Sequence, residues 1–245
     1  MTRRSSRSSE TAAHDGTARI ERSLQEALRK LRNAGEISDE VYQDIRPTGS
    51  VRPRLYGVAK VHKDGTPLRP ILSMYGSPQH VTAQWLARVL KLVQMRYSKH
   101  TVKDSFTFVE MIRQTTVPPS AHMCSFDIKS LFTNVPLEET IDICVNQLYN
   151  SDLQKPALTE KSFRKLIQKV TAGVEFSFND IMYQQVDGVA MGSPLGPVLA
   201  NIFVGYHEER LSIDNRKSLL LYCRYVDDTF PSTSHKTRVR SFWVN

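Results

Sequence analysis

The segment from Leu219 to Phe230 constrains the fold most strongly, because two adjacent acids follow a run of apolar residues. Leucine, β-branched and aromatic residues lead into Tyr225-Val226-Asp227-Asp228, which predicts a β-hairpin with both aspartates at its tip. Adjacent carboxylates repel each other, so a fold gains little from holding them at a turn unless a cation binds there. A solvated Asp-Asp turn is the simpler interpretation and is favoured as long as the motif stands alone.

A third acid, Asp127, lies inside the apolar segment from Met123 to Ile128, which predicts a short buried strand. A buried carboxylate is costly unless a metal, a lysine or an arginine compensates its charge, so a core ion pair is the alternative to a metal site. Asp127 precedes Asp227 by 227 − 127 = 100 residues, so only the fold can unite them. Two neighbouring strands would bring three carboxylates around one point, and such an arrangement holds two divalent ions about 4 Å apart.

A basic hairpin is expected further towards the N-terminus. Hydrophobicity alternates through residues 54–63, the chain turns at Asp64-Gly65, and it returns through residues 68–73. The hairpin carries the basic residues Lys60, Lys63 and Arg69. These side chains are suited to gripping a triphosphate, since arginine offers a bidentate fork and lysine a point charge. A charged hairpin edge that prevents aggregation is an equally good interpretation.

A glycine- and proline-rich loop over residues 187–197 precedes a helix expected over residues 198–211. Small residues such as Gly192 and Ser193 would let the backbone approach a ligand closely, although a plain connection into the helix has the same composition. A long helix is expected over residues 78–98. Its expected buried stripe consists of Val81, Trp85, Val89, Leu92 and Val93.

Charge and cysteine content narrow the class of protein. The net charge is 33 − 25 = +8 with a pI near 9.4, which favours an anionic partner, nucleic acid first. The three cysteines, Cys124, Cys144 and Cys223, lie far apart, which argues against a disulfide framework or a zinc site and suits a reducing intracellular compartment. No apolar run approaches about 18 residues, so no membrane span is expected. A P-loop motif is absent.

Four of these segments, taken in order, resemble reverse transcriptase motifs. Phe126–Phe132 resembles motif A, Ala190–Pro197 motif B, Tyr225–Asp228 motif C, and Leu68–Ile71 the fingers motif with its nucleotide-contacting arginine. The resemblance covers about residues 19–230 and is strongest to Penelope-like retroelements, which are relatives of telomerase catalytic subunits. The stretches similar to that group in particular are Arg46–Ser50, Leu55–Lys63 and Ser130–Pro136.

The resemblance implies an α+β right-hand polymerase fold that transfers deoxynucleotides to a DNA primer on an RNA template, in the nucleus by preference. It implies that two Mg²⁺ ions, or Mn²⁺ as a substitute, are bound by Asp127, Asp227 and Asp228 with help from the Ile128 carbonyl. The residues implied to contact the nucleotide are Arg69, Lys60 or Lys63, the steric gate Phe132, and the loop residues Gly192 and Ser193. The implied parts are a disordered basic tail over 1–18, fingers over 19–120, a palm over 121–230 and a divergent tail over 231–245.

The end of the chain departs from the family pattern. Residues 231–240 are polar and basic, and Pro231 cannot donate a hydrogen bond within the second strand of the hairpin. We therefore expect that strand to be damaged, the palm to be incomplete, and the thumb and any endonuclease to be missing. The first hypothesis concerns ancestry: an RNA-directed DNA polymerase (reverse transcriptase) core with fingers and a partial palm. The second is a truncated, inactive remnant with residual nucleic-acid binding, and a viral RNA-directed RNA polymerase is a distant third.

Overall fold

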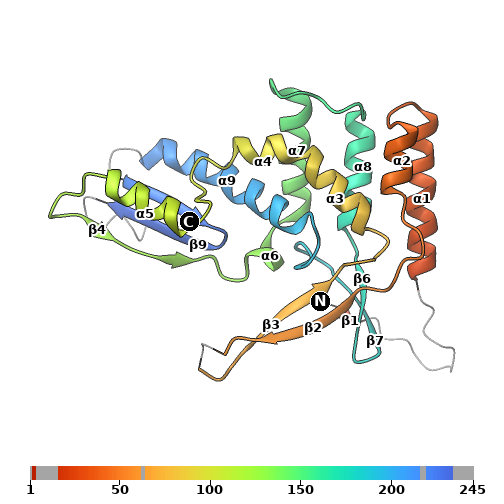
Figure 1. Ribbon diagram of the computed structural model, residues 1–245, viewed down its shortest axis with the longest axis horizontal. Helices are drawn as coiled ribbons and strands as arrows, with labels where there is room; N and C mark the ends of the chain where they lie inside the picture. Colours follow the sequence, from red (N-terminus) through yellow and green to blue (C-terminus); the bar gives the residue numbers. More distant parts are fainter. Residues whose placement is uncertain (1, 4–15, 62–63, 216–218, 234–245) are drawn as a thin grey trace. The chain divides into compact units, whose positions relative to one another are not determined.

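The computed structural model describes residues 2–3, 16–61, 64–215 and 219–233. Lys63, most of the predicted N-terminal tail and residues 234–245 lie outside the described residues. The chain divides into two compact units (Figure 1). Unit 1 comprises residues 1–93 and 132–200, and unit 2 comprises residues 94–131 and 201–245. Both units are therefore discontinuous in sequence, unlike the consecutive ranges predicted for fingers and palm.

Unit 1 contains a layer of helices. They are α1 (Thr17–Asn33), α2 (Asp39–Ile45), α3 (His80–Val89), α7 (Leu137–Asn150) and α8 (Glu160–Thr171). Ser38 and Thr159 cap α2 and α8 by accepting hydrogen bonds from backbone N–H groups, because each side chain reaches an N–H that has no partner within the helix. Neighbouring helices pack α1 on α2, α2 on α3 and α7 on α8, and the buried core of unit 1 lies among them.

The helix expected over residues 78–98 is divided at Leu90, and α4 (Lys91–Arg96) follows α3. Of the predicted buried stripe, Val93 is buried, as expected, and Leu92 is exposed; the other three members, Val81, Trp85 and Val89, are half-buried. The buried residues are Thr82, Ala83, Leu86, Leu90 and Val93, whereas Leu92 from the predicted stripe is 43% exposed. The Thr82 hydroxyl donates to the Ile45 carbonyl at 3.0 Å, which fixes the face with the small residues against α2. Hydrophobic periodicity alone could not select that face.

The sheet of unit 1 has the strand order β1-β7-β6-β2-β3. Its strands are β1 (Thr2–Arg3), β2 (Arg54–Ala59), β3 (Leu68–Ser73), β6 (Glu175–Phe178) and β7 (Ile181–Gln184). Two antiparallel hairpins, β2–β3 and β6–β7, meet where β2 pairs with β6 in parallel (Figure 1). Thr2–Arg3 pair with β7 although they lie in the predicted tail, and α1 begins at Thr17, at the end of that tail, where ordered structure is expected. A buried cluster packs on the sheet: Leu72, Met74, Val174, Phe176 and Ala190.

Unit 2 is built on a sheet in which β9 is the central strand. Its elements are α5 (Ser105–Gln114), β4 (His122–Met123), β5 (Phe126–Asp127), β8 (Leu219–Tyr225) and β9 (Asp228–Thr233). Strand β8 pairs with one edge of β9, and β4 and β5 pair with the other edge. Two further helices, α6 (Leu131–Asn134) and α9 (Gly196–Asn215), continue from one unit into the other. None of the helices within the described ranges is long and apolar enough to cross a membrane.

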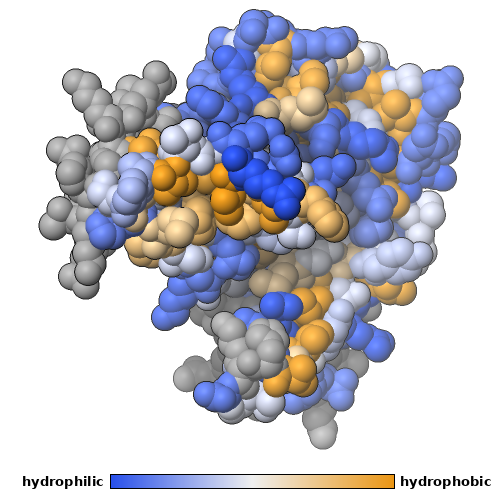
Figure 2. Space-filling model, turned by 60° about the vertical axis from the view of Figure 1, so that its left-hand side comes forward, coloured by the Kyte–Doolittle hydropathy of each residue, from blue (hydrophilic) through white to orange (hydrophobic). Residues whose placement is uncertain are grey.

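The buried strand predicted over Met123–Ile128 is wrong. This segment forms two short strands at the edge of the sheet, with Met123 63% exposed and Asp127 also exposed. Helix α5 contributes no buried residue, and its Phe106 is 85% exposed. On the face drawn in Figure 2, hydrophobic side chains reach the surface in several patches among hydrophilic ones. Because β4 and β5 are largely exposed, the apolar residues of Met123–Ile128 reflect strand propensity rather than burial.

The predicted damage to β9 at Pro231 is also wrong. Strand β9 continues through Pro231 to Thr233, and Pro231 is itself buried opposite Tyr222 of β8. Pro231 lacks a backbone N–H, and this matters at the edge of β9 that faces β4 and β5. There, Cys124 N–H donates to the Pro231 carbonyl at 3.1 Å. Proline cannot return the second hydrogen bond of that pair, which accounts for the interruption between β4 and β5.

Candidate active site

Asp127 and Asp228 face each other across the antiparallel pair β5–β9. Directly opposite residues lie on one face of a sheet with their Cα atoms about 4.5–5.5 Å apart. The N–H of Ile128, next along the chain, donates to the Asp227 carbonyl at 2.8 Å. Neighbouring strands therefore place the backbone of Asp127 beside that of Asp227 and Asp228, and the convergence of all three carboxylates stays a prediction.

The two adjacent aspartates occupy different positions in their hairpin. Val226 and Asp227 form a two-residue turn, whereas Asp228 is the first residue of β9 and pairs with Tyr225. Val226 has a φ of 56°, although a valine rarely takes a positive φ. Asp227 is half-buried and Asp228 is exposed. Asp227 thus belongs to the turn between β8 and β9, whereas Asp228 belongs to β9 and pairs with Asp127.

The donor set suits a hard divalent cation, because two carboxylates on facing strand residues and a third in the adjoining turn are all oxygen ligands. Within the residues that the structure describes, however, no three His, Cys, Asp or Glu side chains converge closely enough to form a metal-binding cluster. Three carboxylates repel each other, so their convergence requires a compensating positive charge. The backbone therefore brings oxygen ligands of the right chemistry near one another, without a converged site among the described side chains.

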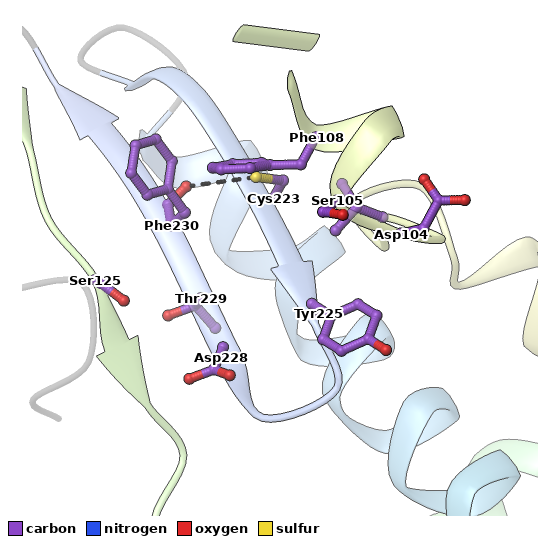
Figure 3. A pocket seen from close by; sticks show the side chains of 10 residues that line it. Asp104, Ser105, Phe108, Ser125, Cys223, Tyr225, Asp228, Thr229 and Phe230 are labelled. Atoms are coloured by element: carbon purple, nitrogen blue, oxygen red, sulfur yellow. Dashed lines mark hydrogen bonds between the residues drawn. The ribbon is translucent and has the colours of Figure 1, made fainter. Parts of the chain in front are cut away.

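A cavity of about 550 Å³ opens on the same face of the hairpin as Asp228, between β8–β9 and α5 (Figure 3). Tyr225 and Asp228 lie at the turn end, and the Phe108 ring meets Phe230 edge-on at 5.1 Å between centroids. Burial raises the pKa of the Cys223 thiol, which also lines the cavity, so the group stays neutral at physiological pH. The cavity is large enough for a small organic ligand or part of a nucleotide.

The opposite face of the hairpin holds a buried ion pair that the sequence reasoning missed. The Arg224 guanidinium contacts Glu208 of α9, with 2.7 Å between Nε and Oε1. Tyr222 donates its hydroxyl to the same carboxylate at 2.6 Å, and burial together with the Glu208 charge raises the pKa of Tyr222. An arginine within an otherwise apolar strand was the available indication, because such a residue is rarely buried without a partner.

The candidate nucleotide-contacting residues of the basic hairpin lie in unit 1. Arg69 is exposed on β3 opposite Val58, so its guanidinium is accessible to an anion. Lys60 follows the end of β2, which is shorter than predicted, and its N–H donates to the Pro67 carbonyl at 2.9 Å. Lys63 lies outside the described residues. The hairpin itself is confirmed, and its tip is exposed on both strands.

Gly192 and Ser193 are held against β3 by the structure of their loop. Gly192 has a φ of +128°, and a Cβ atom there would collide with the Leu72 carbonyl oxygen. Leu72 N–H donates to the Met191 carbonyl at 2.9 Å, which fixes the loop along the strand. The Ser193 hydroxyl oxygen accepts from Leu195 N–H at 3.3 Å. At Gly192 the chain approaches the backbone of β3 closely, and the expected approach to a ligand stays a prediction.

Phe132 packs on the same loop. Its carbonyl accepts from Val189 N–H at 2.7 Å, and a Cβ atom at Gly196 would lie 3.8 Å from its ring. Phe132 is half-buried, so part of the ring remains accessible. Phe132, Gly192 and Ser193 are therefore parts of one local structure in unit 1, whereas Asp127, Asp227 and Asp228 are together in unit 2.

Solved structures similar to this chain are polymerases. Telomerase from Candida albicans, in complex with a TWJ fragment of telomeric RNA, aligns with a TM-score of 0.59 and 11% identity over 89% of this chain and 43% of that chain. Apo telomerase from Candida tropicalis aligns with a TM-score of 0.56 and 12% identity over 91% and 45%. An RNA-dependent RNA polymerase chain aligns with a TM-score of 0.54 and 10% identity over 93% and 23%. The chain thus spans less than half the length of these proteins.

The chain has a polymerase fold of mixed helix and sheet architecture, similar to the folds of telomerase and of RNA-dependent RNA polymerases. The sequence model of one family, reverse transcriptase (RNA-dependent DNA polymerase), matches residues 61–243, which is well over half of the chain. The chain belongs to the reverse transcriptase family. A search of curated proteins found no match. The family match extends through residues 231–243, within the segment that the sequence sets apart as divergent.

Proposed function

We propose that this chain is the nucleotide-adding core of a reverse transcriptase in which Asp127, Asp227 and Asp228 bind two divalent ions, Mg²⁺ by preference. One observation carries the proposal: the register of β5 against β9 puts Asp127 opposite Asp228 and bonds Ile128 to Asp227. The Ile128 carbonyl, next to this bond, is a further oxygen ligand for the site. Bound metal would activate a primer 3′-hydroxyl and stabilise the pyrophosphate that leaves.

The substrates we propose are an RNA template, a DNA primer and deoxynucleoside triphosphates. Arg69 and Lys60, on the accessible hairpin of unit 1, would bind the triphosphate through charge-assisted hydrogen bonds. Gly192 and Ser193, whose loop is fixed on β3, would position the nucleotide and template. The family match and the net charge of +8 support nucleic-acid substrates.

Within the family we assign the chain to Penelope-like retroelements. The similarity of the fold to two Candida telomerases supports this assignment, because the sequence resemblance is to a group related to telomerase. The stretches that carry it lie in both units: Arg46–Ser50, Leu55–Lys63 and Ser130–Pro136.

Primer extension on an RNA template, with Mg²⁺ or Mn²⁺, tests the proposal. We expect extension by the wild type and a loss of at least about a hundredfold in Asp227→Asn, because a charge that stabilises the transition state is removed. Asp180→Asn is the matched control. Asp180 lies in the β6–β7 turn of unit 1, where the same change removes an exposed charge from a residue that already has a positive φ. Equal activity of wild type and Asp227→Asn would refute the metal site.

An inactive remnant with residual nucleic-acid binding is the second candidate, favoured by the absence of a converged three-acid cluster among the described residues. It predicts no extension with either metal, while an RNA–DNA duplex is still retained in filter binding. That binding would weaken steeply with salt, because it would rest on the positive charge of the protein.

Sugar selection separates a reverse transcriptase from an RNA polymerase. The half-buried Phe132, fixed by the loop around Gly196, would exclude a ribose 2′-hydroxyl through the bulk of its ring. Phe132→Ala should therefore raise incorporation of ribonucleotides relative to deoxynucleotides. Phe178→Ala, an exposed aromatic residue on β6, should leave the ratio unchanged. A wild type that prefers ribonucleotides would contradict the proposal and favour the RNA polymerase alternative.

A further inference from the structure

Arg224 is the largest of the fully buried side chains in the described part of the chain, with 0% exposure. A charged group at such a position requires full compensation. Glu208, 3% exposed on α9, provides the opposite charge: Nε lies 2.7 Å from Oε1 and Nη2 lies 3.3 Å from Oε2. The pair is therefore bidentate, the geometry for which the planar guanidinium is suited.

The remaining N–H groups of Arg224 are also bonded. Nη1 donates to Asn201 Oδ1 at 2.9 Å and to the Val226 carbonyl at 3.0 Å, and Nη2 donates to Thr101 Oγ1 at 3.3 Å. With the two bonds to Glu208, all five guanidinium donors have an acceptor. The main chain of Arg224 is fixed too, since its N–H donates to the His100 carbonyl at 2.7 Å and its carbonyl accepts from Val102 N–H at 2.9 Å.

The bond to Val226 falls on the active-site turn. Val226 is the first central residue of the two-residue turn, and there a positive φ is usually supplied by glycine. A β-branched residue in this conformation is strained and needs support from its surroundings. The carbonyl that Arg224 holds belongs to the peptide group that joins Val226 to Asp227. The next peptide group is held by the bond from Ile128 N–H to the Asp227 carbonyl.

We propose that Arg224, oriented by Glu208, is a positioning residue that keeps Val226 in its left-handed conformation and thereby directs the Asp227 carboxylate to the metal site. This inference rests on the proposed function. Arginine is required because a lysine would bring the charge without the planar fork that joins Glu208, Asn201 and Val226. Asp228 lies on the face of the hairpin opposite to Arg224. Arg224 and Glu208 can therefore support the turn without covering the face that carries Asp228.

The test measures Mn²⁺ binding to the full chain by electron paramagnetic resonance, without primer, template or nucleotide. Asp227→Asn first defines the signal that depends on the site. We expect Arg224→Lys to weaken that binding by about tenfold or more, as for other groups that orient metal ligands. Tyr222→Phe is the control, because it removes a hydrogen bond from Glu208 and leaves the Arg224 contacts in place. It should bind Mn²⁺ like the wild type.

Rescue separates positioning from general stability. Glycine takes a positive φ without strain, so Val226→Gly added to Arg224→Lys should restore most of the Mn²⁺ affinity. A second variant guards against loss of folding in Arg224→Lys. It replaces the buried ion pair by apolar side chains through three changes, Tyr222→Phe, Glu208→Leu and Arg224→Met. The effect of such a replacement on folding stability is often neutral or stabilising. This triple variant should be folded by circular dichroism and still bind Mn²⁺ about tenfold more weakly or worse.

Two results would overturn the inference. Wild-type Mn²⁺ affinity in the folded triple variant or in Arg224→Lys would refute the positioning role alone and leave the metal site intact. No Mn²⁺ binding that depends on Asp227 in the wild type would refute the proposed function, and the positioning role with it.

Discussion

Asp127 and Asp228 are cross-strand partners although 228 − 127 = 101 residues separate them. Like charges directly opposite each other destabilise an antiparallel pair. The sheet of unit 2 therefore holds two carboxylates in an arrangement that a divalent cation would stabilise.

Asp228→Asn should raise the melting temperature of the protein in EDTA by a few degrees, because it removes a repulsion of less than about 1 kcal/mol. The wild type should gain stability on addition of Mn²⁺, and the variant should gain much less. Differential scanning calorimetry in both conditions measures this. Asp180→Asn is the control with an equal loss of charge. An unchanged melting temperature of the wild type on addition of Mn²⁺ would contradict the prediction.

Gly192→Ala should lower the free energy of unfolding by more than about 2 kcal/mol, because the added Cβ meets the Leu72 carbonyl and the φ of +128° does not suit alanine. Gly35→Ala separates the two causes. Gly35 also has a positive φ, +71°, but nothing lies within 4 Å of the position that an added Cβ atom would take. It should cost about 1 kcal/mol. Urea denaturation measures both changes, and equal costs would rule out the close approach as the dominant cause.

Arg69→Gln should raise the KM for deoxynucleoside triphosphate by about tenfold with little change in kcat, because one charge-assisted hydrogen bond contributes about 1.5–3 kcal/mol. Arg54→Gln removes the same charge from an exposed position of the same hairpin, on β2 opposite Ser73. Steady-state primer extension should show a change of less than about twofold for Arg54→Gln. Similar effects of the two variants would assign the role to net charge rather than to Arg69.

The stability of the protein should fall between neutral pH and pH 5 in part because of His100. Burial lowers the pKa of His100 below its ordinary 6.5, despite the opposing effect of Glu208. The unfolded chain therefore binds a proton at higher pH than the folded chain, and acidification favours unfolding as pH falls below about 6.5. His100→Gln should lose stability less steeply over this range. Parallel slopes for the two proteins in urea denaturation at several pH values would exclude His100 as a cause.

Local patterns in the sequence were sufficient for much of the fold. The side chains of Ser38, Asp104 and Thr159 accept hydrogen bonds at the starts of α2, α5 and α8, and α8 is amphipathic. These helix ends and this helix face depend only on residues within a few positions. The β6–β7 hairpin and its Asn179-Asp180 turn, where both residues have a positive φ, follow from the same local rules.

Predictions failed where a distant partner decided the outcome. The buried face of α3 depends on the contact of Thr82 with Ile45, and the exposure of β4 and β5 depends on which edge of β9 they pair with. Strand β9 tolerates Pro231 because the missing N–H points to the interrupted edge rather than to β8. Hydrophobic pattern and propensity contain no information about these partners.

Residue type and short-range spacing were enough to indicate the reverse transcriptase family and the hairpin that carries Asp227 and Asp228. Packing of distant segments was needed to place Asp127 opposite Asp228, to set Gly192 against the Leu72 backbone, and to bond Arg224 both to Glu208 and to the Val226 carbonyl. These relationships join segments 16 to 120 positions apart. They exist only once packing has placed strands in register and compensated a buried charge.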